Sequence, residues 1–241
     1  MFLCSITPVK NKELMYDRVC VMLLAHLSEK YPEYSEMASK SSCYKIMDNS
    51  IIEKGNAFNL KDLVNEAHKC KANEIILPDV YKDAKETVKK VKESIKWLKN
   101  NWCYYDFQLM AVCHGNNKEE FEWCFNELNN IKEINVIGVP KVINKWCGSR
   151  NNFMYLYQKS KKQIHYLGAP DNFNELVELK DNLNKLLIRS IDTCLPSLLA
   201  IEGKSYLDNR REVTIDLEKE EIPLENYKKI IEDIDKDFEL D

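Results

Sequence analysis

Short apolar runs alternate with longer amphipathic stretches along the chain. The apolar runs cover residues 1–7, 44–50, 74–80, 107–115, 134–140, 163–170 and 188–196. The amphipathic stretches, with apolar residues spaced three and four apart, cover residues 12–39, 59–72, 82–100, 117–131, 150–162 and 172–187. Short apolar runs separated by helices predict βαβ units and a parallel sheet that is buried on both faces.

The number of these units favours a closed barrel. Open doubly wound sheets typically have five or six strands, whereas seven or eight consecutive units are typical of an α/β fold of the (β/α)8 barrel type. We expect an eighth, less regular unit from a strand at 211–217 and a helix at 224–238. The chain is predicted to be a single barrel domain over 1–241, in which 204–241 is a divergent acidic C-terminal segment.

Polar residues in front of the amphipathic stretches predict where helices begin. Asn59, Asp83 and Asn117 each precede such a stretch, and Asn172 with Glu175 forms a variant of the capping box. Side chains of this kind accept hydrogen bonds from the free N–H groups of a first helical turn.

The residues that end the apolar runs carry the candidate chemistry, because barrel enzymes build their active sites at the C-terminal ends of the strands. These residues are Asp48, Asp79, His114 with Gly115, Gly138, Gly168 and Asp192. Three acids, one imidazole and three of the six glycines are therefore expected to converge on one rim.

Each of these residues also has a purely structural interpretation. An aspartate at a strand end often caps the next helix, a glycine permits a tight turn, and a single histidine often supports a loop. Asp48 and Asp79 are weaker as caps, because Asn59 and Asp83 lie nearer the helix starts. Convergence on one rim favours chemistry over these separate explanations.

Two or three carboxylates on a glycine-lined rim suit cleavage or exchange of an N-glycosidic bond. One carboxylate can accept two hydrogen bonds from a purine edge, and another can attack C1′ of the sugar. The same acids would equally suit a divalent metal for phosphate or aldol chemistry, and their spacing does not separate the two interpretations.

Composition narrows the choice of partners. A hydrophobic content of 44% allows a sizeable core, and the net charge of −4 gives no global attraction for nucleic acid. Nine widely spaced cysteines, without a secretory signal ahead of them, predict free thiols in a reducing cytosol. The scattered histidines and the lack of CxxC motifs predict neither a metal nor a cofactor. No apolar run approaches the length of a membrane span, so no membrane partner is expected.

The strand ends also form an ordered set of motifs over residues 44–203. "KIMDNS", "IILPDV", "AVCHG" and "INVIGV" resemble strands that end in "TDSGG", "DEC", "QG" and "IGG". "QIHYLGAP", followed by a helix and "IRSIDTCLPS", resembles a "YLMGVG-P" strand followed by "GIDxFDCVxPT". Taken in this order, the motifs resemble the tRNA-guanine transglycosylase superfamily. These are (β/α)8 enzymes that exchange guanine for a 7-deazaguanine base in tRNA, with relatives that act on DNA.

The resemblance implies a catalytic role for two acids. Asp192 would be the nucleophile that forms a covalent intermediate with C1′, although the two-acid motif is shortened to "IDTC" and Asp192 aligns with either acid. Asp48 would act as the acid/base or polar partner beside the sugar. Asp79 would bind the Watson–Crick edge of the base. The other residues implied in base binding are His114, Gly115, Gly138, Tyr166 and Gly168.

The departures from the family pattern concern the nucleic-acid partner. The second glycines of "SGG" and "IGG" are missing, with Ile51 and Val139 nearby, and no arginine follows "PS". The family's C-terminal "CxCxxC…H" zinc module, which helps to dock tRNA, has no counterpart. We therefore expect the tRNA-binding half of the family function to be lost or rebuilt.

Three hypotheses follow. The leading one is a zinc-free cytoplasmic transglycosylase for a purine or 7-deazaguanine base in tRNA, DNA or a nucleotide. The second is a catalytically inactive barrel that acts as a binding or partner subunit. The third is a metal-dependent aldolase or phosphatase that uses Asp48 and Asp79 as ligands. The resemblance also leaves a homodimer open.

Overall fold

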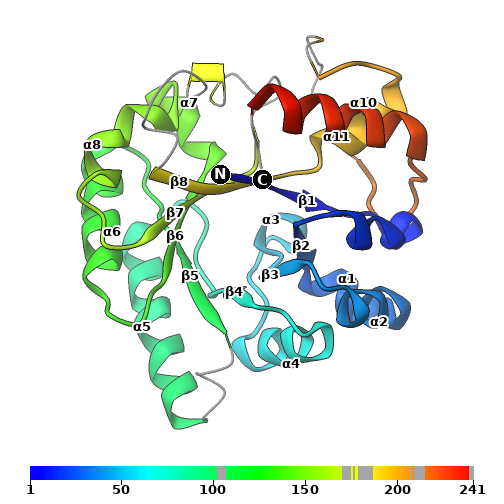
Figure 1. Cartoon of the computed structure of the whole chain (residues 1–241). Coiled ribbons are helices and arrows are strands. Elements are labelled where there is room, and N and C mark those ends of the chain that lie inside the picture. The colour runs from blue at the N-terminus through cyan, green and yellow to red at the C-terminus, as the bar shows by residue number, and fades with distance from the viewer. Residues whose placement is uncertain are drawn as a thin grey trace.

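Eight parallel strands close into a barrel in the computed structural model (Figure 1). The structure describes residues 1–101, 107–169, 175, 177–178, 187–206, 208 and 215–238. The strands are β1 (Phe2–Ile6), β2 (Cys20–Leu24), β3 (Tyr44–Asp48), β4 (Glu74–Ile76), β5 (Gln108–Val112), β6 (Val136–Pro140), β7 (Gln163–Leu167) and β8 (Ile188–Thr193). Each strand pairs with its neighbour in chain order, and β8 closes on β1 with Cys4 opposite Asp192. The predicted (β/α)8 fold is confirmed.

The barrel strand that the seven predicted runs did not include is β2. The prediction that this strand lies at 211–217 was wrong. Residues 20–24, "CVMLL", are buried throughout and lie inside the stretch that we expected to be one helix over 12–39. That stretch instead contains the end of a 3-10 helix (η1, Val9–Asp17), then β2 and two short helices. Of the expected strand at 211–217, residues 211–214 lie outside the described residues, and 215–217 form no strand. The strand that carries Asp192, β8, is therefore the last strand of the barrel in chain order.

Helices surround the strands (Figure 1). They are α1 (Ala25–Lys30), α2 (Pro32–Lys40), α3 (Ile51–Lys54), α4 (Leu60–Cys70), α5 (Ala84–Asn100), α6 (Lys118–Asn130), α7 (Asn144–Cys147), α8 (Met154–Tyr157), α10 (Leu195–Glu202) and α11 (Leu224–Phe238), with short 3-10 turns η3 (Lys141–Ile143) and η4 (Arg150–Phe153). None of the helices in the described part of the chain is long and apolar enough to cross a membrane.

Three of the predicted helix caps are confirmed. The side chains of Asn59, Asp83 and Asn117 accept hydrogen bonds from backbone N–H groups in the first turns of α4, α5 and α6. Asn172 lies outside the described residues. The caps fix where α4, α5 and α6 begin, and so set the lengths of the loops that follow β3, β4 and β5.

The predicted C-terminal helix is α11, which packs beside α10 (Figure 1). Its buried residues, including Tyr227, Ile230 and Ile234, follow the three- and four-residue spacing of an amphipathic helix. The backbone of Ile222 donates to the Asn11 side chain, which ties the segment before α11 to η1. Residues 215–238 of the acidic C-terminal segment thus lie on the outside of the barrel, beside α10 and η1.

An ion pair closes the N-terminal end of the barrel interior. Arg189 on β8 donates two hydrogen bonds, of 2.7 and 3.1 Å, to the fully buried carboxylate of Glu74 on β4. The Tyr44 hydroxyl donates to the same carboxylate. Apolar side chains such as Ile46, Ile76 and Met110 fill the interior above this pair. Only the opposite end, where the strands finish, carries the predicted acids.

Candidate functional site

Asp48 is the least buried of the three predicted acids. It is the last residue of β3, and its Oδ2 accepts a hydrogen bond of 2.7 Å from the Ser50 N–H. Burial raises the pKa of the Asp48 carboxyl well above its usual range. The negative charges of Glu53, Asp192 and Asp79 raise this pKa further, while the Ser50 N–H opposes the rise. Asp48 is therefore suited to carry a proton, and it interacts electrostatically with both other acids.

We expect the change Asp48→Asn to stabilise the protein. Folding raises the pKa of the Asp48 carboxyl above its unfolded value of 3.8. The carboxyl therefore lowers the stability of the folded state increasingly as the pH rises from 3.8 toward the folded pKa. The asparagine carries no titrating group, so the variant should have a larger free energy of unfolding than wild type at pH 7.

Urea unfolding of wild type, Asp48→Asn and the exposed control Asp62→Asn between pH 4 and pH 8 measures this effect. The difference between Asp48→Asn and wild type should widen with pH, and the control should show no such trend. A variant that is less stable than wild type at pH 7 would contradict the assigned environment of Asp48.

Asp79 lies at the centre of a buried hydrogen-bonded group. Its side chain is 1% exposed; Oδ1 accepts from Asn49 Nδ2 at 2.7 Å, and Oδ2 contacts His114 Nε2. The Lys82 N–H donates to Nδ1 of His114, so a neutral His114 carries its proton on Nε2 and donates to Asp79. The structure therefore brings Asp79 and His114 together, as predicted, and holds both in fixed orientations.

Asp192 lies on the inner face of β8 and is 4% exposed. Its Oδ1 accepts two hydrogen bonds of 3.0 Å, from His165 Nε2 and from the backbone N–H of Gly168. Gly168 has a φ of +73°, a conformation that L side chains rarely adopt, which accounts for the glycine. The predicted residues Asp192 and Gly168 are therefore in direct contact.

The loops that follow β3 and β4 carry backbone strain at this rim. Ser50 and Lys82 have φ values of +57° and +62°, although neither is glycine. Each uses its N–H to hold a site residue, since Ser50 donates to Asp48 and Lys82 donates to His114. Strained conformations of this kind cost about 1–3 kcal/mol and cluster at functional sites.

Three predicted base-binding residues do not join the acids. Tyr166 points to the outer face of β7, where its ring lies 4.3 Å from the Arg150 guanidinium and its hydroxyl donates to Asn151. Gly138 leaves space for Leu167 and Met110, because a Cβ there would lie 2.8 Å from Leu167 Cδ1. Gly115 packs against the backbone of α6. These positions have structural explanations in this fold.

We expect Gly115→Ala to destabilise the protein. A Cβ at Gly115 would lie 2.5 Å from the backbone nitrogen of Phe121, which cannot move without shifting α6. Overpacking of this kind costs about 1–3 kcal/mol. Urea unfolding checks the prediction against Gly55→Ala, where a Cβ meets nothing within 4 Å and only the positive φ costs about 1–2 kcal/mol. Unchanged stability in Gly115→Ala would argue against a packing role.

Arg150 fastens the end of β6 to the end of β7. Its side chain is fully buried and donates to the backbone carbonyls of Val139, Leu167 and Gly168 at 2.8–2.9 Å. It also pairs with the buried carboxylate of Glu175 at 2.6 Å. Burial opposes ionisation of Glu175, but the Arg150 charge and hydrogen bonds lower the pKa of this carboxyl. The clamp fixes the backbone of Gly168, and through it one hydrogen bond to Asp192.

The predicted site residues did not include His165 and Asn49, whose side chains contact Asp192 and Asp79. The signal for His165 is its place in "QIHYL", two residues before Leu167, which puts it on the inner face of β7. The signal for Asn49 is weaker, because it follows Asp48 in a loop whose conformation depends on Ser50. Both act by hydrogen bonding and neither stood out as an isolated residue.

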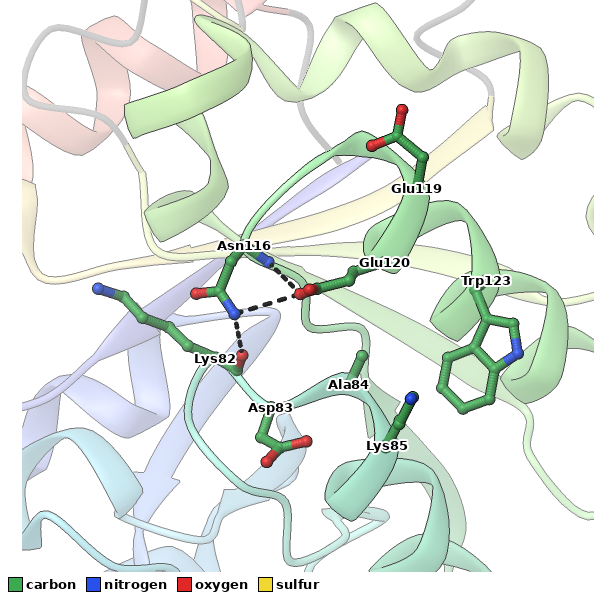
Figure 2. Close-up of a pocket in the computed structure, with 8 residues that line it drawn as sticks. All are labelled: Lys82, Asp83, Ala84, Lys85, Asn116, Glu119, Glu120 and Trp123. Atoms are coloured by element: carbon green, nitrogen blue, oxygen red, sulfur yellow. Dashed lines mark hydrogen bonds between the residues drawn. The ribbon is translucent and has the colours of Figure 1, made fainter.

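A separate pocket of about 470 Å³ lies beside this rim, at the starts of α5 and α6 (Figure 2). Figure 2 shows Asn116 between Lys82 and Glu120, with its amide bonded to both. Trp123 lines the opposite wall. Within the described residues, no group of three or more His, Cys, Asp or Glu side chains is arranged to hold a metal ion. Each acid at the rim accepts hydrogen bonds from its own neighbours: Asp48 from Ser50, Asp79 from Asn49 and His114, and Asp192 from His165 and Gly168.

No protein-family model matches the chain, and no curated protein matches its sequence. The resemblance of residues 44–203 to the transglycosylase superfamily stays a prediction.

Proposed function

We propose that the protein is a base-exchange transglycosylase that replaces or removes a guanine-type base at C1′ of a nucleic acid or nucleotide. Asp192 is the nucleophile, and Asp48 is the acid and base. The observation that carries this proposal is that Asp48, at the end of β3, and Asp192, near the end of β8, lie at the same rim, where burial, then Glu53, and then Asp192 and Asp79 raise the pKa of Asp48. Paired acids in unlike environments are typical of glycosyl transfer.

The reaction proceeds by two displacements. A carboxylate oxygen of Asp192 attacks C1′, the C1′–N bond breaks, and its electron pair leaves with the base, which takes the proton of Asp48. The product is a glycosyl ester of Asp192. An incoming base or water then attacks C1′, gives its proton to the Asp48 carboxylate, and releases Asp192 as the carboxylate. Proton and charge are balanced over the cycle.

Asp79 and His114 are placed to recognise the base. A carboxylate oxygen has two lone pairs, so each oxygen of Asp79 can accept one more hydrogen bond beyond those from Asn49 and His114. A guanine-type edge presents adjacent N–H donors that match such a carboxylate. Tyr81 stands at the same rim with its ring edge-on to His114 and is 42% exposed, so it offers a face for an aromatic ligand.

One observation favours the alternative of a catalytically inactive barrel that serves as a binding or partner subunit. Asp79 and Asp192 are almost fully buried, and each oxygen of Asp79 already has one hydrogen-bond partner within the protein. In that case the acids would serve the fold, as buried hydrogen-bonded groups do elsewhere. The two functions differ in whether a sugar ever reaches Asp192.

Incorporation of labelled guanine separates the two functions. The wild-type protein is incubated with labelled guanine, or with a labelled 7-deazaguanine, and in turn with tRNA, duplex DNA and purine nucleotides. Time-dependent transfer of the label into one of these substrates supports the transglycosylase. Binding of the base without transfer into any substrate contradicts it and favours the inactive barrel.

A further inference from the structure

A buried chain of polar side chains runs inside the barrel from its N-terminal end to Asp192. Arg189 Nε donates to Ser190 Oγ at 3.0 Å, Ser190 Oγ lies 2.6 Å from His165 Nδ1, and His165 Nε2 lies 3.0 Å from Asp192 Oδ1. Ser190 and His165 are fully buried. The register of β7 and β8 shifts between Ile164 and His165, which places His165 opposite Ser190.

The direction of each hydrogen bond follows from the chemistry of the groups. A guanidinium only donates, so Ser190 Oγ accepts from Arg189. The Ser190 hydroxyl has no other acceptor among the described residues, so its proton points to Nδ1 of His165. Nδ1 then accepts, and the imidazole proton is on Nε2, which donates to Asp192. The bidentate pair with Glu74 holds Arg189 in place at the start of this chain.

We propose that Arg189, Ser190 and His165 form a positioning relay that fixes Asp192 Oδ1 and leaves Oδ2 as the attacking oxygen. Oδ1 receives two hydrogen bonds, from His165 and Gly168, whereas Oδ2 makes none with the residues that the structure describes. The role of Asp192 as nucleophile rests on the proposed function, but the direction of the relay does not. His165 is a positioning residue, because it acts through Asp192 and contacts no reacting atom.

The surroundings of His165 keep the imidazole neutral. Burial lowers the pKa of His165, and Arg189 lowers it as well, although Asp192 and Glu74 act in the opposite direction. A neutral imidazole with an acceptor at Nδ1 transmits the orientation set by Arg189 without adding a charge beside the nucleophile. Asp79 has a parallel arrangement, in which the Lys82 N–H sets the orientation of His114.

Nitrogen-15 NMR of the histidine side chains in the full-length protein tests the relay directly. We expect His165 to be the neutral Nε2–H form at pH 7, with Nδ1 unprotonated, and Ser190→Ala to lose this strict preference. An Nδ1–H form or an imidazolium in wild type would overturn the relay. The result does not depend on activity, so a protein with the expected tautomer and no base exchange would contradict the proposed function and leave the relay standing.

Kinetics test the positioning role where exchange occurs. His165→Leu should lower kcat on the order of 100-fold, the loss expected from a displacement of about 1 Å, with KM changed little. His165→Gln, whose amide N–H can still donate to Asp192, should recover part of the loss, and the exposed control His68→Gln should match wild type. Ser190→Ala serves as a milder variant if His165→Leu does not fold. Equal kcat in His165→Leu and wild type would overturn the role.

Discussion

Replacing Arg150 by methionine should lower the free energy of unfolding by about 3–5 kcal/mol, the loss expected when one partner of a buried ion pair is removed. The variant leaves the Glu175 carboxylate buried without its cation and removes the guanidinium donor from the carbonyls of Val139, Leu167 and Gly168. Urea unfolding at pH 7 measures the loss, with the exposed control Lys145→Met expected within about 0.5 kcal/mol of wild type.

The pH dependence identifies the cause of that loss. Arg150 lowers the pKa of Glu175, so this carboxyl contributes stability above its unfolded pKa of 4.5, which is lost as the pH falls through the folded value. The difference in the free energy of unfolding between wild type and Arg150→Met should therefore become smaller below pH 4.5. A double variant, Arg150→Met with Glu175→Met, should recover part of the stability, because it removes both charges. If the difference in unfolding free energy between wild type and Arg150→Met were the same at all pH values, the loss would not come from the Arg150–Glu175 ion pair.

Asp192→Asn should abolish base exchange, with a loss of at least about 10⁴-fold in kcat, comparable to the removal of a nucleophile in other covalent enzymes. The amide oxygen of asparagine can still accept from His165 and Gly168, so the fold should persist. Because an amide is a poor nucleophile, no glycosyl ester can form. Exchange of labelled guanine, measured beside circular dichroism and unfolding curves, separates loss of chemistry from loss of structure.

Asp62→Asn provides the matched control, since Asp62 is exposed in the first turn of α4. This variant should exchange base at the wild-type rate. If Asp192→Asn kept the wild-type rate, the nucleophile would have to be another group, and Asp48 would be the next carboxyl to test.

The sequence was sufficient to predict the barrel and the strand ends that carry acids. Alternation of apolar runs and amphipathic helices identified seven of the eight strands, and the caps Asn59, Asp83 and Asn117 marked three helix starts. The apolar pattern did not predict β2, because "CVMLL" is a short, fully buried strand whose flanking residues also fit a helical spacing. Short apolar runs of this kind do not distinguish a buried strand from a buried helix.

The contacts between rim residues could not be predicted from the strand ends alone. His165 faces Asp192 only because the register of β7 and β8 shifts by one residue, and such shifts leave no clear signal in composition. Tyr166 follows His165 in β7 and therefore points to the opposite face of the strand, where its ring packs on Arg150 away from the acids. Asn49 follows β3 directly and donates to Asp79, which follows the neighbouring strand β4, a contact between two loops that the sequence pattern does not show.

Mass spectrometry of a covalent adduct tests the central claim most directly. The wild-type protein is incubated with the substrate that accepts labelled guanine, without an incoming base, then denatured and digested. We expect a glycosyl adduct that survives denaturation, maps to the peptide containing Asp192 and is missing in Asp192→Asn. An adduct on another residue, or base exchange with no adduct at any time, would contradict the assignment of Asp192 as the nucleophile.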